Sequence, residues 1–323
     1  MVSGGIDEGA EVVALVERGG FVESAHRGHA VAVRGDGRAV ARRGDPGAVF
    51  FPRSSLKPVQ AVAMLRAGLD LDGELLALAC ASHSGEPAHL DGVRKILAGA
   101  GLTEADLQNA PAEPWGADEA FAWRAAGGGP AAIAQNCSGK HAAMLATCVA
   151  AGWDPRGYRD PAHPLQRAIR TAVAELTGDG GPARTAVDGC GAPLFSCTVA
   201  GLARAFAAIA TAPPGTSEHR VAAAVRAHPW WVGGTGREVT ALIAGLPGLL
   251  AKDGAEGVFA AALPDGRAAA VKIADGGERP RSAVLVTLLH RLGVEAPVLD
   301  ALLHVPVLGH GEPVGRVEVV GLG

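Results

Sequence analysis

The chain has 323 residues, 48% of them apolar and 19% charged, and carries a net charge of −4. This length allows one large domain or two smaller ones, and the composition is that of an ordinary water-soluble globular protein. The slightly acidic balance argues against nucleic acid or an anionic membrane as a main partner. No apolar run reaches the roughly 18 residues of a membrane span. Met1 to Glu11 lacks the basic and then apolar order of a secretory signal, so we expect a cytoplasmic protein.

The first predicted elements are strands of a small antiparallel sheet. Glu11 to Glu17 and His29 to Arg34 alternate or run apolar, as strands do. Asp36-Gly37 is typical of a hairpin turn and leads into Arg38 to Ala41. The sheet therefore precedes the first helix.

That first helix opens with an S-x-x-K pattern. Ser54 stands where an N-cap is expected, Pro58 lies in the first turn, and Gly68 marks the end. Ser54 and Lys57 are three residues apart and so share one face of the opening turn. In this arrangement a neutral lysine can take the hydroxyl proton of the serine. The alternative is a capping serine beside a solvated lysine.

Lysine is scarce in this chain, since only five of its 29 Lys and Arg residues are lysines. Arginine fills most solvated positions, so a retained lysine points to a need for an amine that can lose its proton. Lys95 reads as a helix-surface residue. The other four lie in motif-like, Gly-rich or apolar settings: Lys57, Lys140, Lys252 and Lys272.

The middle of the chain, about residues 55–230, is predicted to be mostly helical. Leu75 to Ala81 is a short buried run, interpreted as a strand whose end carries site residues. Asn109 to Pro130 reads as a loop folded over another part of the molecule. The predicted helices are Pro87 to Gly99, Lys140 to Ala151, His163 to Thr177, Pro193 to Ala210 and Glu218 to Ala227.

The C-terminal part returns to strands. Val258 to Ala262 and Ala268 to Lys272 read as a hairpin, followed by a last helix, Ser282 to Leu292, and a strand, Arg316 to Val320. The terminal strands would join one antiparallel sheet beside a helical lobe, which predicts one α+β domain over residues 1–323. By analogy, this is the organisation of serine β-lactamases and penicillin-binding enzymes.

Further segments carry side chains capable of chemistry. They are Cys80 to Glu86, Asn136 to His141, Thr185 to Pro193, Ala251 to Gly257 and Val271 to Gly276. Each has a plainer interpretation as a polar turn, a helix-start loop with a buried cysteine, an N-capping turn or a surface turn. Their combination decides between these interpretations.

The chain contains a set of motifs in one fixed order: R-S-x-x-K-P-x-Q, C-A-S-H-S-x-E, N-C-S-G-K-H, D-G-C and G-x-G-R with x-K-x-G-A-E-G. This set resembles the rhizobial-type L-asparaginases, also labelled asparaginase II, from about Val13 to about Leu292. The resemblance implies a β-lactamase-like fold, a homodimer, and hydrolysis of L-asparagine to aspartate and ammonia by two Ser-Lys pairs beside a zinc site. A short region around Thr211 to Thr216 departs from the family pattern.

The resemblance also assigns catalytic residues. It implies that Ser54 pairs with Lys57 and that Ser82 pairs with Lys252, with Lys272 as the alternative partner. A lysine base must fall from a pKa of about 10.4 to near 7, at a cost of about 4–5 kcal/mol. Burial and a neighbouring ammonium can supply such a shift, and two lysines in one pocket would depress each other's pKa. Backbone N–H groups at the start of the Ser54 helix are the expected oxyanion donors.

For the substrate, the resemblance implies that Asp188 binds the α-ammonium, with Arg53 and His83 also at the site. For about one zinc ion per chain it implies the ligands Cys137, Lys140 and Cys190, with water or substrate in the fourth position. Cysteines of a cytoplasmic protein should be reduced, which disfavours a Cys137–Cys190 disulfide. The plainer alternative is two buried thiols and a lysine paired with a carboxylate.

Two rival functions remain open from the sequence. One is another Ser-Lys amide or ester hydrolase, such as a glutaminase or a D,D-peptidase or β-lactamase-like enzyme. The other is a non-catalytic zinc-containing binding protein on the same fold. Intact Ser54, Lys57, Ser82 and Lys252 speak against the second.

Overall fold

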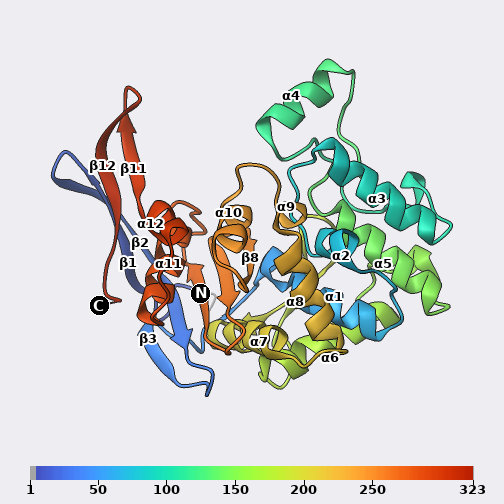
Figure 1. Ribbon diagram of the computed structural model, residues 1–323, viewed down its shortest axis with the longest axis horizontal. Helices are drawn as coiled ribbons and strands as arrows, with labels where there is room; N and C mark the ends of the chain where they lie inside the picture. The colour runs from blue at the N-terminus through green and yellow to red at the C-terminus, as the bar shows by residue number, and fades with distance from the viewer. Residues whose placement is uncertain (1–4, 323) are drawn as a thin grey trace.

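The computed structural model describes residues 5–322 (Figure 1). The described residues leave out residues 1–4, which belong to the N-terminal stretch considered above, and residue 323, which is the last of the predicted domain. An eight-stranded antiparallel sheet stands beside a helical lobe, which confirms the predicted α+β arrangement. Within residues 5–322, no helix has both the length and the apolar character needed to cross a bilayer.

The sheet joins strands from both ends of the chain, as predicted. Its order is β11-β12-β1-β2-β10-β9-β8, with β3 paired to β2, and every pairing is antiparallel. The strands are β1 (Glu11–Arg18), β2 (Phe21–Val33), β3 (Ala39–Arg43), β8 (Leu250–Gly254), β9 (Val258–Ala262), β10 (Ala268–Ile273), β11 (Val305–Gly309) and β12 (Glu312–Val319).

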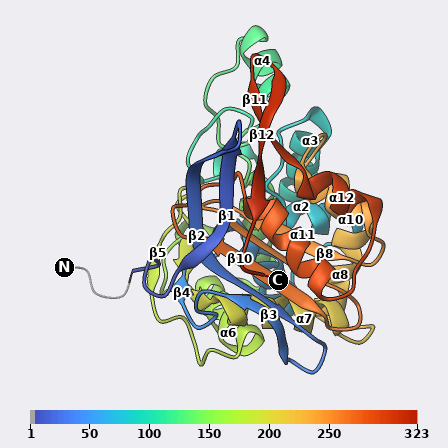
Figure 2. The same ribbon diagram turned by 90° about the vertical axis from the view of Figure 1, so that its left-hand side faces the viewer.

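The sheet has a buried half and an exposed half. Every residue of β8, β9 and β10 is buried, because α7 (Val199–Thr211) packs on one face and α11 (Arg281–Arg291) on the other. The hairpin ends of β1–β2 and β11–β12 extend away from these helices (Figure 2). In β2 the first residues are exposed and the last six are buried, so one strand serves both halves. Lysines on β8 and β10 therefore lie inside the protein.

The helical lobe is built around α1, which contacts α5, α6 and α8. Nine of the ten residues of α1 are buried, including the polar Lys57 and Gln60, so this helix lies inside the lobe. The helices beside α7 and α11 are α1 (Lys57–Arg66), α2 (Gly73–Ala79), α3 (Pro87–Gly99), α4 (Ala117–Ala125), α5 (Ser138–Ala150), α6 (Pro164–Thr177), α8 (Ser217–Ala227), α9 (Pro229–Val232), α10 (Glu238–Gly245) and α12 (Pro297–Leu303). Two short pairs of strands complete the lobe: β4 (Val49–Phe50) with β7 (Cys197–Thr198), and β5 (Thr185–Val187) with β6 (Pro193–Phe195).

Several predicted elements were wrong. Leu75 to Ala81 does not form a strand, because most of it is helix α2, packed against α8, α5 and α3. Pro193 to Ala210 is not one helix, since its first residues pair with β5 and β4 before α7 begins. Ser54 is not an N-cap: it lies in the 3₁₀ turn Arg53–Leu56 that precedes α1. Helix α4 interrupts the predicted loop Asn109 to Pro130, and α12 and β11 follow the helix predicted to be last.

Candidate active site

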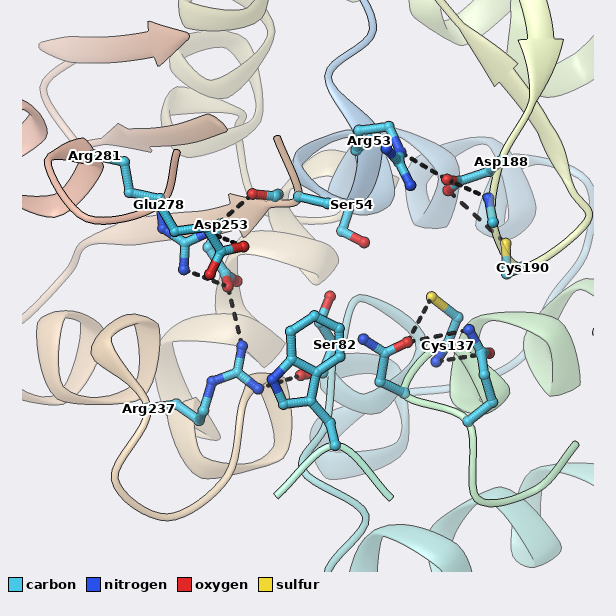
Figure 3. Close-up of a pocket in the computed structure, with 16 residues that line it drawn as sticks. Arg53, Ser54, Ser82, Cys137, Asp188, Cys190, Arg237, Asp253, Glu278 and Arg281 are labelled. Atoms are coloured by element: carbon cyan, nitrogen blue, oxygen red, sulfur yellow. Dashed lines mark hydrogen bonds and ion pairs between the residues drawn. The ribbon is translucent and has the colours of Figure 1, made fainter. Parts of the chain in front are cut away.

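A cavity of about 190 Å³ lies where the helical lobe meets β8 (Figure 3). Eight separate segments supply its walls: the 3₁₀ turn before α1, the loop after α2, the loops before α4 and α5, the β5–β6 turn, the segment before α10, the end of β8 and the start of α11. Six of the predicted site residues line it together: Arg53, Ser54, Ser82, Cys137, Asp188 and Cys190. The fold therefore gathers residues that are far apart in sequence into one small space.

The Ser54 turn is held against β8 by a close backbone approach. A Cβ atom on Gly254 would lie 2.7 Å from the carbonyl oxygen of Pro52, so only glycine fits at this position of β8. The Ser55 hydroxyl donates to the carbonyl oxygen of Lys252 at 3.0 Å. These contacts fix Ser54 at the cavity wall.

Lys57 contacts Ser82. The Nζ atom of Lys57 lies 3.0 Å from the Ser82 hydroxyl oxygen, and it also donates to the carbonyl oxygen of Ala81. The lysine is 1% exposed and the serine 5%, so water does not screen this contact. The hydroxyls of Ser54 and Ser82 point toward each other across the cavity (Figure 3). Among the described residues, the serine hydroxyl that Lys57 contacts is thus Ser82 and not Ser54.

Lys252 is fully buried on β8 and its Nζ atom donates to the side chain and carbonyl oxygen of Asp253. Burial lowers the pKa of Lys252 to about 8, Asp253 opposes that shift, and Lys57 adds to it. Lys272, on β10, donates to the carbonyl oxygen of Glu256 and lines a different cavity. The structure therefore places Lys252, and not Lys272, beside the Ser82 cavity, although the hydrogen bond of Lys252 goes to Asp253.

Asp188 and Arg53 form an ion pair at the cavity wall. The Nε atom of Arg53 lies 2.7 Å from an Asp188 carboxylate oxygen. Burial would raise the pKa of Asp188, but Lys140 and Arg53 together lower it, so the group is a carboxylate. Arg53 has a φ of 51°, a left-handed conformation that costs a non-glycine residue about 1–3 kcal/mol. This unfavourable backbone conformation is the cost in free energy of directing the guanidinium toward Asp188.

Cys137, Lys140 and Cys190 come together as predicted. Both thiols are buried, and the Nζ atom of Lys140 lies 3.1 Å from the Cys190 sulfur. None of the five cysteines, all within the described residues, forms a disulfide in the structure, and the prediction of reduced thiols in the cell stays a prediction. Within residues 5–322, no three His, Cys, Asp or Glu side chains form a metal-holding group. A zinc site here would need the lysine, and two thiolates with one amine are nitrogen and sulfur donors of the kind that zinc accepts.

His83 is fully buried and does not line the cavity. Its Nε2 atom lies 2.9 Å from the Ser138 hydroxyl, and burial lowers the pKa of the imidazole well below its usual value. The backbone N–H of His83 donates to the carbonyl oxygen of Asn136. His83 therefore ties the Ser82 loop to the start of α5.

The cavity also contains residues that the sequence reasoning did not assign: Trp115, Arg237, Asp253, Glu278 and Arg281. The sequence could have pointed to two of these residues, because the G-x-G-R motif contains Arg237 and Asp253 directly follows Lys252. Trp115 lies in the predicted loop Asn109 to Pro130, which does fold over the cavity. Their grouping depends on tertiary contacts.

Comparison with known proteins adds a family assignment. Solved structures match the chain at low similarity. One is a β-lactamase from Mycobacterium bovis, with 17% identity over 85% of this chain and 93% of that one, at a TM-score of 0.43. Another is EstCE1, a hydrolase with promiscuous acyltransferase activity, with 14% identity over 92% of this chain and 95% of that one, at a TM-score of 0.38. No curated protein matches the chain. The sequence model of the family described as L-asparaginase II matches residues 14–319, nearly the whole length. The chain therefore belongs to the L-asparaginase II family.

Proposed function

We propose that this protein hydrolyses L-asparagine to L-aspartate and ammonia through a serine nucleophile activated by a lysine. The observation that carries the proposal is the 3.0 Å contact between the Lys57 amine and the Ser82 hydroxyl inside the cavity that also contains Asp188. Membership of the L-asparaginase II family supports an amide of a small amino acid as the substrate. Sites for drug-sized ligands usually measure about 300–1,000 Å³, so the volume of about 190 Å³ suits such a substrate.

Chemistry at this site begins with proton transfer. Neutral Lys57 takes the hydroxyl proton as the Ser82 oxygen attacks the side-chain amide carbon of the substrate. The lysine ammonium then returns the proton to the leaving nitrogen, which departs as ammonia and leaves an ester on the serine. A water molecule gives its proton to the amine, attacks the ester and releases aspartate, and Ser82 regains its proton. Ser54, whose hydroxyl faces Ser82, is the alternative nucleophile.

Lys252 supports this chemistry in our proposal as the second lysine. It is buried near Lys57, whose positive charge helps to lower the pKa of Lys252, so Lys252 is the second candidate for the neutral base. Asp188 would bind the α-ammonium of the substrate, with Arg53 beside it for the carboxylate. Both groups of a free amino acid then have a partner at the cavity wall.

A zinc ion at Cys137, Lys140 and Cys190 is part of the proposal. The three side chains already meet, and Cys190 lines the same cavity as the serines. Lys140 would have to lose its proton, which costs about 4–5 kcal/mol from an ordinary pKa and more here, because Cys190, Cys137 and Asp188 raise the pKa of this lysine. Structural zinc binding of roughly 10–16 kcal/mol can cover that cost. When bound, the ion would supply positive charge and fixed geometry beside the substrate site.

The test of function compares three substrates under identical conditions. Ammonia release from asparagine, release from glutamine and nitrocefin hydrolysis are measured with the parent protein. Asparagine turnover well above the other two supports the proposal. Preferential glutamine or nitrocefin turnover would identify another Ser-Lys hydrolase, and no turnover with retained ligand binding would favour a binding protein. Homodimer formation, which the family resemblance implies, stays a prediction that light scattering can check.

A further inference from the structure

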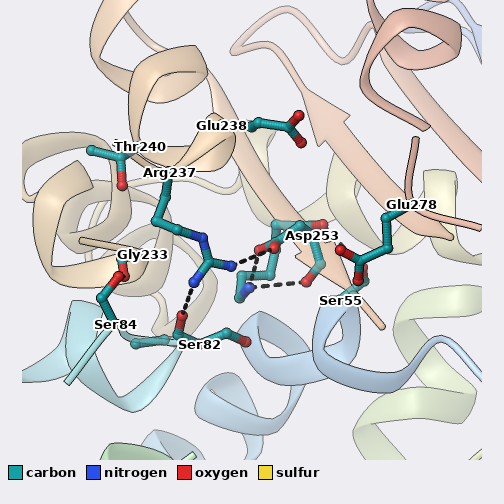
Figure 4. Close-up of polar contacts among 12 residues, drawn as sticks. Ser55, Ser82, Ser84, Gly233, Arg237, Glu238, Thr240, Asp253 and Glu278 are labelled. Atoms are coloured by element: carbon teal, nitrogen blue, oxygen red, sulfur yellow. Dashed lines mark hydrogen bonds and ion pairs between the residues drawn. The ribbon is translucent and has the colours of Figure 1, made fainter. Parts of the chain in front are cut away.

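Arg237 crosses from the sheet to the loop that carries Ser82. It directly precedes α10, and its guanidinium makes two contacts in opposite directions (Figure 4). The Nη1 atom donates to the main-chain carbonyl oxygen of Ser82 at 3.2 Å, and the Nη2 atom lies 3.2 Å from a carboxylate oxygen of Asp253. Its side chain is 18% exposed and that of Asp253 is 7% exposed. Both contacts are therefore largely shielded from water.

Asp253 continues the link to Lys252. Its other carboxylate oxygen accepts from the Lys252 ammonium, and a guanidinium nitrogen of Arg281 lies 3.7 Å from the oxygen that Arg237 contacts. An unbroken series of polar contacts thus runs from the Ser82 main chain through Arg237 and Asp253 to Lys252. Ser82 belongs to the helical lobe and Lys252 to the sheet. The series therefore fixes the two parts of the candidate catalytic machinery relative to each other.

Only arginine fits this position well. Its planar guanidinium presents several N–H donors in a rigid fork, so it can serve a carbonyl oxygen and a carboxylate at once. The guanidinium carbon also lies 5.4 Å from the centroid of the Trp115 ring, which covers it on the cavity side. A lysine at position 237 could reach one acceptor but not hold both in fixed geometry.

Arg237 also affects the charge balance around Lys252. Four charged or titratable groups face that amine: Asp253 on β8, Lys57 on α1, Arg237 before α10, and the buried thiol of Cys80 after α2. Arg237 takes part of the negative charge of Asp253 and adds positive charge of its own. Both effects make it easier for Lys252 to lose its proton.

We propose that Arg237 is a positioning residue that binds the Ser82 main chain to Asp253 and so holds Ser82 in register with Lys57 and Lys252. The inference rests on the serine chemistry proposed above. It assigns Arg237 no contact with the reacting atoms. Arg237 acts indirectly: it holds the Ser82 carbonyl in place, and it pairs with the Asp253 carboxylate that also binds Lys252.

The experiment measures how fast Ser82 reacts with a fluorophosphonate, a probe that needs an activated serine but no substrate recognition. In that reaction the Ser82 oxygen bonds to phosphorus, fluoride leaves, and the hydroxyl proton passes to the lysine amine. Mass spectrometry assigns the labelled serine. The proteins compared are the parent, Arg237→Met, Arg237→Lys and the control Arg267→Met. Arg267 is a matched control because it likewise bridges a carboxylate, Asp265, and a main-chain carbonyl, that of Leu292, both at 2.7 Å, outside the cavity.

We expect Arg237→Met to label Ser82 about 10²-fold more slowly, the loss typical of a misplaced reacting group. Arg237→Lys should fall between it and the parent, and Arg267→Met should match the parent. The midpoint of the rise of labelling rate with pH should move to higher pH in Arg237→Met, because Lys252 then keeps its proton longer. If Arg237→Met does not fold, as judged by circular dichroism, Arg237→Lys carries the test by the same criteria.

Equal rates in Arg237→Met and Arg267→Met would overturn the inference. A slower rate with an unmoved midpoint would overturn it too, since a general loss of packing gives that result. Absence of labelling at Ser82 in the parent also counts against it. A parent that labels at Ser82 but releases no ammonia from asparagine refutes the proposed function and leaves this inference standing.

Discussion

Among the three buried lysines beside the cavity, Lys252 and Lys140 differ most clearly in their chemistry. Burial lowers the pKa of Lys252 to about 8, even though Asp253 holds its ammonium. Burial acts on Lys140 in the same direction, but Cys190, Cys137 and Asp188 together outweigh it and raise its pKa. Burial alone therefore does not decide whether a lysine stays charged; the number of negative neighbours does. The Lys252 side suits proton transfer, whereas the thiol side suits a fixed positive charge or a metal ion.

The largest effect should come from the serines on the proton-transfer side. We expect Ser54→Ala and Ser82→Ala each to lower asparagine turnover by at least about 10³-fold, as when a nucleophile or its proton relay is lost. Steady-state ammonia release measures this, with Ser217→Ala at the start of α8 as a control outside the cavity. Near-normal kinetics in both variants would refute the Ser-Lys mechanism.

On the opposite side, Asp188→Asn should act through substrate recognition. Removing one partner of a desolvated charge pair costs about 2–5 kcal/mol, so kcat/KM for asparagine should fall accordingly, with KM taking most of the change. Asp300→Asn, at an exposed position of α12, serves as the control. If Asp188→Asn handles asparagine as well as the parent, the carboxylate does not bind the α-ammonium.

The pH dependence of kcat/KM should show whether Lys252, on the proton-transfer side of the cavity, acts as a base. A general base works only when neutral, so if Lys252 takes the serine proton in place of Lys57, activity should rise with pH and level off above the Lys252 pKa of about 8. A single essential base gives about a tenfold loss per pH unit below its pKa. Lys252→Met should remove this rise together with most of the activity, whereas Lys95→Met on the surface of α3 should change neither. A profile that is flat from pH 6 to 9 would contradict a role for Lys252 as a base.

The smallest expected effect on the serine chemistry concerns the metal. Protein purified without chelator and without a polyhistidine tag should contain about one zinc ion per chain by elemental analysis. Cys137→Ala should lose it, while Cys148→Ala, also buried and on the α5 helix that Cys137 directly precedes, should retain it. Full activity in metal-free parent protein would remove zinc from the mechanism and leave the thiol side as a buried charge cluster.

Much of the local structure followed from short-range sequence signals. The predicted bounds of the helix Pro87–Gly99 and the strand Val258–Ala262 agree with the structure, because their apolar spacing and flanking breakers are local. The family resemblance implied one site for Ser54, Ser82 and Asp188, and these three residues line one cavity. Their residue types alone suggested nucleophiles and an acid, whatever the path of the chain between them.

The partner of each side chain was decided by tertiary structure alone. Lys57 meets the hydroxyl of Ser82, 25 residues away, while Ser54, three residues away, faces the cavity. The motif around His83 suggested a residue of the site, yet packing turns its imidazole toward Ser138 and away from the cavity. Arg237 joins Ser82 across 155 residues. Such contacts depend on how elements that are distant in sequence pack together, and local propensity carries no information about that geometry.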